Sequence, residues 1–285
     1  MWVIFATLNP IFDASRNVFS KKASLNVDSL VVSWINNVIP LILYFPIIFF
    51  IDLKFNQQFF ISVVISGSIN TAAAILYHKA ISRGDISVVV PMLSFTPLFL
   101  LVISPLLVGE FPTVNGLIGI VLIVVGSYLL NVNLKERGIF YPLKSIFKNK
   151  ATRYMLIVAF IWSISANFDK KGIEASSIFQ YIIFINLFVT IGTTIFSISS
   201  GKLSLHSVWS ERKNLFFVGV LTSMAYFVHM TALSMTLVAY VIALKRTAGM
   251  ITIVLGYFFL REQNIQERLL GSTIMFVGVL FIVLF

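Results

Sequence analysis

Long apolar runs separated by short polar segments are the main pattern of this 285-residue sequence. The runs approach or exceed the roughly 20 residues that a helix needs to cross a bilayer. They are continuous rather than alternating, which disfavours a β-barrel. We therefore predict an all-α polytopic membrane protein with ten transmembrane helices. The predicted spans are residues 2–19, 30–50, 58–79, 86–108, 114–133, 153–170, 177–199, 214–234, 238–260 and 268–285.

The second half of the chain repeats the first. Glu110 recurs as Glu262, 152 residues later, and the same interval relates several glycines; nearer the N-terminus the interval is 149 residues. An odd number of helices repeated in tandem must lie in the membrane in opposite orientations, because the second copy begins on the side where the first ends. This architecture is typical of transporters. We expect two inverted five-helix repeats and a basic linker, at residues 1–133, 153–285 and 134–152.

Composition narrows the class further. The chain is 58% hydrophobic and 11% charged, and its mean hydropathy is +0.96, far from the values of a soluble domain. It contains no cysteine, so disulfides and thiolate metal sites are excluded. The net charge of +10 does not indicate a nucleic-acid partner, because the basic residues lie mostly in short loops between spans.

The basic residues also bear on orientation. Most of the 21 lysines and arginines lie on the side of the linker, so the positive-inside rule places the linker in the cytoplasm and both termini outside. The linker alone contributes Lys135, Arg137, Lys144, Lys148 and Lys150. We expect a multi-pass protein of the plasma membrane, in contact with the lipid bilayer.

Several motif residues have physical roles of their own. Glycines seven apart share one helix face and permit close helix packing in lipid; the two pairs are Gly119 with Gly126 and Gly271 with Gly278. Glu110 and Glu262 precede closing helices, where a carboxylate suits the unsatisfied N–H groups, although a gating ion pair is an alternative. Pro91 and Pro97 lie in one apolar run and permit a kink there, either for structure alone or to form a substrate site.

This pattern resembles the drug/metabolite transporter superfamily, specifically its EamA-type permeases. The resemblance rests on the ten-helix pattern, the duplicated Gly-Glu or Arg-Glu turn before a Gly-x6-Gly helix, and the segment from Ser87 through Pro91 to Pro97. It implies two inverted five-helix repeats that move small metabolites by alternating access, as exporters or exchangers. Members are commonly drawn with both termini in the cytoplasm, opposite to the orientation that the charges indicate.

The sharpest chemical signal is the pair Lys245 and Arg246, inside the predicted span 238–260 with no acidic residue in that span. Buried cations in a membrane need a wet cavity or an anion. The repeat counterparts are Leu93 and Ser94, so the fold itself does not require charge here. We predict a substrate-anion site, with an internal salt bridge, for example to Asp13 or Asp169, and snorkelling to the interface as alternatives. The pair also resembles the phosphate-binding pair of sugar-phosphate translocators in the same superfamily.

Other polar residues within spans are weaker candidates. Asp13 and Arg16 are three residues apart and can pair with each other; alternatively Arg16 is a second substrate contact and Asp13 a proton carrier. Because histidine as a residue type titrates near neutral pH, His229 and His78 are candidates for substrate binding and proton coupling, respectively, although a hydrogen-bonded packing role competes for both. Asn37 and Tyr240 are further candidates for a polar cavity, although packing roles compete for both.

We predict a secondary permease for a small polar, anionic or zwitterionic metabolite, acting as a monomer or homodimer. An organophosphate exchanger is one alternative, and an intramembrane lipid-processing enzyme is an alternative of another class. No nucleotide-binding loop or metal-ligand spacing is present in the sequence, so we expect no cofactor, and no catalytic residue is assigned.

Overall fold

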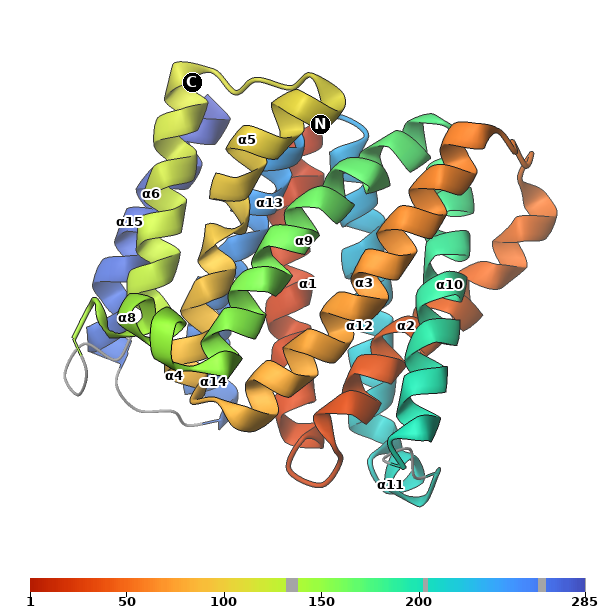
Figure 1. Ribbon diagram of the computed structural model, residues 1–285, viewed down its shortest axis with the longest axis horizontal. Helices are drawn as coiled ribbons and strands as arrows, with labels where there is room; N and C mark the ends of the chain where they lie inside the picture. The colour runs from red at the N-terminus through yellow and green to blue at the C-terminus, as the bar shows by residue number, and fades with distance from the viewer. Residues whose placement is uncertain (132–137, 202–204, 261–264, 285) are drawn as a thin grey trace. The chain divides into compact units, whose positions relative to one another are not determined.

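The computed structural model of the chain describes residues 1–131, 138–201, 205–260 and 265–284. All elements in these ranges are helical (Figure 1). A helix satisfies its backbone hydrogen bonds internally, which is what a chain surrounded by lipid requires. The elements are α1 (Trp2–Ala23), α2 (Ser29–Tyr44), η1 (Phe45–Phe50), α3 (Gln57–Arg83), α4 (Ile86–Val89), η2 (Val90–Phe95), α5 (Thr96–Val108), α6 (Val114–Asn131), α8 (Tyr141–Lys148), α9 (Lys150–Glu174), α10 (Ile178–Ser199), α11 (Leu205–Ser210), α12 (Arg212–Leu233), α13 (Val238–Arg246), α14 (Ala248–Leu260) and α15 (Ile265–Leu284).

Each predicted apolar run is mostly helical over the residues that the structure describes. Within the described part of the chain, seven helical segments are long and apolar enough to cross a membrane. Two further apolar helices, Val114–Leu130 and Leu270–Leu284, are shorter. Helix α1 is not among the seven, and it carries Asp13 and Arg16 near its middle. The all-helical, polytopic class is thus observed, while the count of ten spans stays a prediction.

Local sequence explains several helix ends. The Asp28 carboxylate accepts a hydrogen bond of 2.8 Å from Leu30 N at the start of α2, and Ser177 Oγ accepts one of 3.2 Å from Gln180 N at the start of α10. These contacts satisfy N–H groups that the first turn leaves open. Helix α5 ends at Gly109, whose φ of 71° is in the left-handed region that favours glycine.

Two compact units make up the fold. The first consists of Met1–Ile75 and Phe168–Met235, and the second of Leu76–Asn167 and Thr236–Phe285. Each unit therefore draws on both halves of the sequence, and helices α3 and α9 contribute residues to both units. The boundaries predicted for the repeats describe the sequence, whereas the compact units describe packing.

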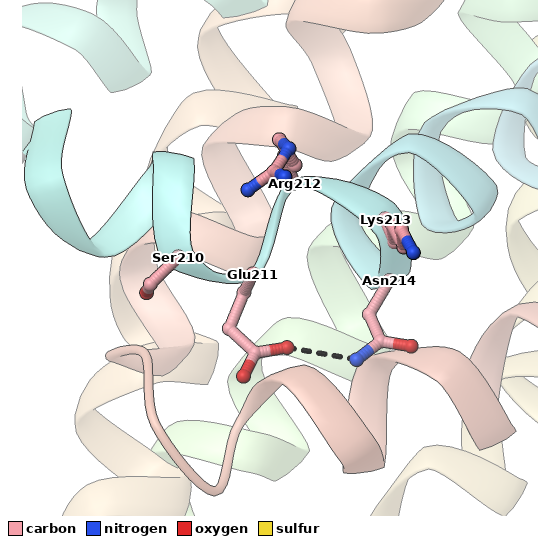
Figure 2. Close-up of a pocket in the computed structure, with 5 residues that line it drawn as sticks. All are labelled: Ser210, Glu211, Arg212, Lys213 and Asn214. Atoms are coloured by element: carbon pink, nitrogen blue, oxygen red, sulfur yellow. Dashed lines mark hydrogen bonds between the residues drawn. The ribbon is translucent and has the colours of Figure 1, made fainter.

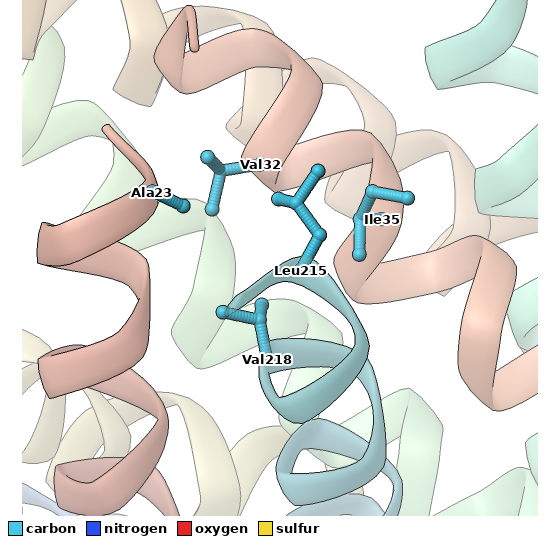
Figure 3. Packing of buried hydrophobic residues seen from close by; sticks show 5 residues of the cluster. All are labelled: Ala23, Val32, Ile35, Leu215 and Val218. Atoms are coloured by element: carbon cyan, nitrogen blue, oxygen red, sulfur yellow. The ribbon is translucent and has the colours of Figure 1, made fainter. Parts of the chain in front are cut away.

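In the first unit, α1 packs along α12, and α2 contacts both α10 and α12. A buried apolar cluster lies where α1, α2 and α12 meet (Figure 3). Its members are Ala23, Val32, Ile35, Leu215 and Val218. Small and branched side chains at these positions let the three helices approach closely.

In the second unit, α6 packs along α15. The four glycines singled out in the sequence lie at this contact. A Cβ added at Gly119 would lie 2.7 Å from Gly278 O, and one at Gly126 would lie 2.5 Å from Gly271 O. Backbone meets backbone here, so any larger residue would push the two helices apart.

Candidate functional site

Two interrupted helices form the centre of the candidate site, and both belong to the second unit. The segment 86–108 is α-helical at both ends and 3₁₀-helical over Val90–Phe95. The segment 238–260 is interrupted at Thr247. Thr247 corresponds to Phe95 under the interval of 152 residues, so the two interruptions lie at equivalent places in the two sequence repeats. Discontinuous helices that expose backbone polar groups are a recurrent feature of transporter binding sites.

Proline and threonine chemistry accounts for the interruptions. Pro91 lies in the first turn of η2 and Pro97 in the first turn of α5, positions where the missing N–H costs little. Thr247 N and Thr247 Oγ1 both donate to Leu244 O, at 3.0 and 2.7 Å. These bonds tighten the last turn of α13, and α14 begins at the next residue.

Lys245 and Arg246 occupy the end of α13, directly before the interruption, and both are half-buried. Arg246 Nη2 donates to Thr96 Oγ1 at 2.9 Å. Thr96 is buried and begins α5; its hydroxyl donates to Leu93 O at 2.8 Å. The guanidinium of one interrupted helix therefore reaches the start of the last segment of the other.

Further hydroxyl groups lie near this junction. Ser94 Oγ in η2 and Ser127 Oγ in α6 are 2.8 Å apart and both residues are buried. Together with Thr96 and the two cations they introduce polar groups into an otherwise apolar helix packing. Hydroxyls and cations are suitable ligands for carboxylate or phosphate oxygens.

Tyr240 and Glu110 form a second set of contacts, at the beginning of α13. Glu110 Oε2 accepts a hydrogen bond of 2.7 Å from Val238 N, the first residue of that helix. Tyr240 Oη lies 3.1 Å from Thr113 N, which donates to it, and 3.2 Å from Thr113 Oγ1. The segment between α5 and α6 is thereby tied to the first turn of α13.

The remaining candidates divide between the two units. His78 is buried on α3 in the second unit, and Glu262 lies outside the described residues. In the first unit, Arg16 Nη1 lies 2.8 Å from Asp13 Oδ1, an ion pair within α1. Asp13 and Arg16 thus belong to a different compact unit from Lys245 and Arg246.

His229 and Asn37 also belong to the first unit. His229 is buried on α12. Asn37 Nδ2 donates to Ser33 O at 2.9 Å, and its repeat counterpart Asn186 makes the same bond to Ile182 O at 2.8 Å. The amide hydrogens of both repeat mates are thus used within their own helices.

Two surface hollows, each formed by described residues, have linings that include neither Lys245 nor Arg246. One lies at the start of α12, where Glu211 Oε2 accepts from Asn214 Nδ2 at 2.7 Å (Figure 2). Asn26 Nδ2 donates to Glu211 Oε1 at 2.6 Å. The hydrogen bonds from Asn214 and Asn26 lower the pKa of the Glu211 carboxyl. The other hollow lies in the first unit, over the start of α3 and the end of α9.

The sequence reasoning considered Asp169 only as a partner for Lys245 or Arg246 and gave it no role of its own. In the structure it is buried near the end of α9, and Ser66 Oγ and Tyr181 Oη both donate to it. Its counterpart in the first repeat is Ser20. The criterion that singled out Lys245 and Arg246, a charge in one repeat only, would therefore have identified Asp169 as well.

Comparisons with known proteins show what this fold and sequence are similar to. A solved crystal structure of a protein superposes on the chain with a TM-score of 0.80, at 12% identity, over 99% of this chain and 97% of that one; at this identity the likeness concerns the fold. The uncharacterized protein MJ1333.1 of Methanocaldococcus jannaschii is 32% identical over 78 residues, which are 27% of this chain and 57% of that protein. The chain thus spans little more than half the length of that relative.

The family model covers much more of the chain. The model of the EamA-like transporter family matches residues 1–132 and 150–284. It matches once on each side of the basic linker and accounts for most of the sequence. This chain therefore belongs to the EamA-like transporter family.

Proposed function

We propose that this member of a transporter family is a secondary permease that moves a small anionic or zwitterionic metabolite by alternating access. In this proposal, ten helices cross the membrane as two inverted five-helix repeats. Lys245 and Arg246 contact the anionic group of the substrate. The single observation that carries the proposal is that Arg246 ends one interrupted helix and donates to Thr96 at the junction of the other.

Charge and position support this role. A cation inside a membrane protein is costly unless it meets an anion or water, and the repeat counterparts Leu93 and Ser94 are uncharged. Both cations are half-buried rather than enclosed, so they keep an accessible surface. Arg246 supplies a planar fork and Lys245 a compact point charge, a combination that suits a carboxylate or phosphate group.

Two adjacent residues on a helix point about 100° apart, so the two cations have different tasks in this proposal. Arg246 fixes the anionic group beside Thr96. Lys245 attracts that group as it enters or leaves. A phosphate ester and a carboxylate both match this arrangement, and an organophosphate exchanger is the narrower form of the same proposal.

A ligand screen by thermal unfolding of the purified protein tests the assignment. A ligand that binds only the folded state raises the unfolding temperature, and the rise grows with the logarithm of its concentration divided by its dissociation constant. The probes are phosphate esters, carboxylates, amino acids and uncharged sugars. We expect a stabilising compound in one of the first three classes. Its affinity should fall about ten- to hundredfold in Arg246→Gln, because a hydrogen bond to a charged group contributes about 1.5–3 kcal/mol.

The matched controls use the same kind of substitution elsewhere. Lys148→Gln removes an exposed cation of α8 and should leave the affinity unchanged, whereas Lys245→Gln should lower it. A stabiliser that binds to both Lys245→Gln and Arg246→Gln as tightly as to the wild type would disprove the anion site. An internal salt bridge predicts a different result, namely a lower unfolding temperature of both variants without any ligand.

A further inference from the structure

A buried carboxylate in the first unit has a hydrogen-bonding environment of its own. Asp169 lies in α9, within the apolar segment Lys150–Glu174 that is long enough to cross a membrane. Tyr181 Oη of α10 donates to Asp169 Oδ1 at 2.8 Å, and Ser66 Oγ of α3 donates to the same oxygen. Tyr181 and Ser66 are completely buried. Ionisable groups in such segments are rare and are usually functional.

The direction of these hydrogen bonds is set by a fourth residue. Asn70 Nδ2 donates to Ser66 Oγ at 3.1 Å. An amide nitrogen can only donate, so Ser66 Oγ accepts this bond and directs its own hydrogen at Asp169. Oδ1 therefore accepts hydrogen bonds from two hydroxyls.

A stripe of polar side chains on α3 leads to this carboxylate. Gln58, Ser62, Ser66 and Asn70 follow one another at intervals of four residues, which places successive members one turn apart on the same face. Gln58 Nε2 donates to Ser62 Oγ at 3.2 Å. Ser62, like Ser66, is completely buried. At about 1.5 Å per residue, the stripe extends about 18 Å along the helix.

The N-terminal end of the stripe, at Gln58, lies beside a surface hollow. Gln58 lines this hollow together with Asn56, Lys171 and Glu174, and its volume is about 810 Å³. A water molecule takes about 30 Å³ in the liquid, so the hollow has room for many. Asp169 lies only two residues before Lys171 on α9. Water therefore reaches α9 within one helical turn of Asp169.

Charged and titratable groups surround Asp169 on several helices. Tyr181 on α10 and Ser66 on α3 contact it directly. On α12, the Tyr226 phenol lies within electrostatic range of Asp169 and also of Asp13 and Arg16 on α1. On α9 itself, the next residues are Lys170 and Lys171, and Lys171 Nζ lies 5.7 Å from the centre of the Phe168 ring. A change in the charge of Asp169 therefore acts on Tyr181 of α10 and on Tyr226 of α12.

We propose that Asp169 binds and releases the coupling proton of this transporter, and that the α3 stripe connects it to the surface hollow. A hydronium ion in the hollow gives up its proton, a bond forms between that proton and a carboxylate oxygen of Asp169, and water remains. Release reverses the step. Protonation removes the negative charge that attracts the hydrogen-bond donors Ser66 Oγ and Tyr181 Oη. The contacts of α3 and α10 with α9 are thereby weakened. The inference rests on the proposed function, because a coupling proton requires a transported solute.

Infrared difference spectra of the purified protein test proton binding without any substrate. Between acidic and alkaline buffers, we expect the C=O band of a protonated carboxyl, shifted in D₂O, in the wild type. The band should be absent in Asp169→Asn and present at a shifted frequency in Asp169→Glu and Tyr181→Phe. Asp52→Asn, which removes an exposed carboxylate of the same unit, is the matched control and should keep the band.

Three outcomes overturn the proposal. In the first, the carboxyl band is unaffected by Asp169→Asn and by Tyr181→Phe. In the second, the band is lost in Asp13→Asn instead. In the third, sodium rather than acid produces the Asp169-dependent change. If Asp169→Asn does not fold, Tyr181→Phe decides the question, because its band must shift. Lack of solute transport would refute the proposed function and leave the spectra unchanged, so the two failures are distinguishable.

Proteoliposomes then test coupling. An imposed pH gradient should accelerate uptake of the solute found in the ligand screen in the wild type and in Asp52→Asn, but not in Asp169→Asn. Equal acceleration in Asp169→Asn would overturn the assignment of Asp169 as the coupling group.

Discussion

Replacing Gly126 by alanine tests the close contact between α6 and α15. The added Cβ would lie 2.5 Å from Gly271 O, 2.6 Å from Met275 Cγ and 2.7 Å from Met275 N. Ordinary van der Waals contact begins at 3.4 Å. Two of the three atoms belong to the backbone of α15, so rotation of a side chain cannot relieve the overlap. The two helices must separate by about 0.9 Å, the difference between 3.4 and 2.5 Å.

The size of the effect follows from this overlap. Inserting a carbon into a well-packed contact costs about 1–3 kcal/mol, and the higher helix propensity of alanine offsets up to about 1 kcal/mol of that. We expect the free energy of unfolding to fall by about 1–2 kcal/mol, which lowers the ratio of folded to unfolded protein about five- to thirtyfold. Gly271→Ala pushes the same helices apart. The double variant should therefore lose less than the sum of the two single losses.

Reversible denaturation of the purified protein in detergent micelles measures these losses. Gly249→Ala is the control, because a Cβ there would meet only Leu130 Cδ2, at 3.4 Å, and we expect no loss of stability. Equal stability of Gly126→Ala and Gly249→Ala would refute the packing argument. Strict additivity of Gly126→Ala and Gly271→Ala would show that the two glycines do not act at one contact.

Three further predictions concern the helix ends. Glu110→Ala removes the acceptor of Val238 N and should lower the free energy of unfolding by about 1 kcal/mol. Glu110→Gln keeps an acceptor oxygen and should lose less stability. Equal losses of stability in the two variants would show that the acceptor is unimportant. Tyr240→Phe deprives Thr113 of its partner and should cost about 1 kcal/mol, measured by thermal unfolding; an unchanged unfolding temperature contradicts this. The Glu211 pKa is lowered by its hydrogen bonds, so its contribution to stability is present above the ordinary pKa and is lost as the pH falls through the lowered pKa. Hydrogen exchange of the segment between α1 and α2 should therefore rise in acid in the wild type and be insensitive to acid in Glu211→Gln. An acid response in that variant would contradict the assignment.

The helical segments were predictable because the lengths of the apolar runs determine them. The interruption at Thr247 was not, because no proline marks the break and the charged pair directly before it, Lys245 and Arg246, was interpreted as a substrate site rather than as the end of a helix. The equivalent interruption at Val90–Phe95 carries Pro91, and the sequence analysis did anticipate a kink there. A break made by side-chain hydrogen bonds of threonine has no strong signal in the sequence.

Long-range contacts were the part of the site that sequence reasoning did not find. Glu110 was expected near the beginning of a helix, but the sequence could not show that it accepts from Val238, 128 residues later. The partner of Arg246 is Thr96, a common residue with no pattern around it. Such pairs depend on how helices pack, and hydrophobic periodicity does not encode which helices are neighbours.

The compact units illustrate the same limit. The repeats are visible in the sequence because equivalent residues recur, yet each compact unit combines segments of both halves. Recurrence reports common ancestry of two segments and not their contacts. The functional proposals rest on residues that differ between the repeats, and Asp169 opposite Ser20 is a further case.

The most direct test of the transport proposal is exchange of a labelled anionic solute across the membrane of proteoliposomes. The solute is the compound that stabilises the purified protein, and the same compound, unlabelled, is placed on the other side. We predict rapid exchange by the wild type and by Lys148→Gln, and a loss of about tenfold or more in Arg246→Gln at subsaturating solute. Exchange by Arg246→Gln at the wild-type rate, in protein that is folded and inserted, would contradict the account.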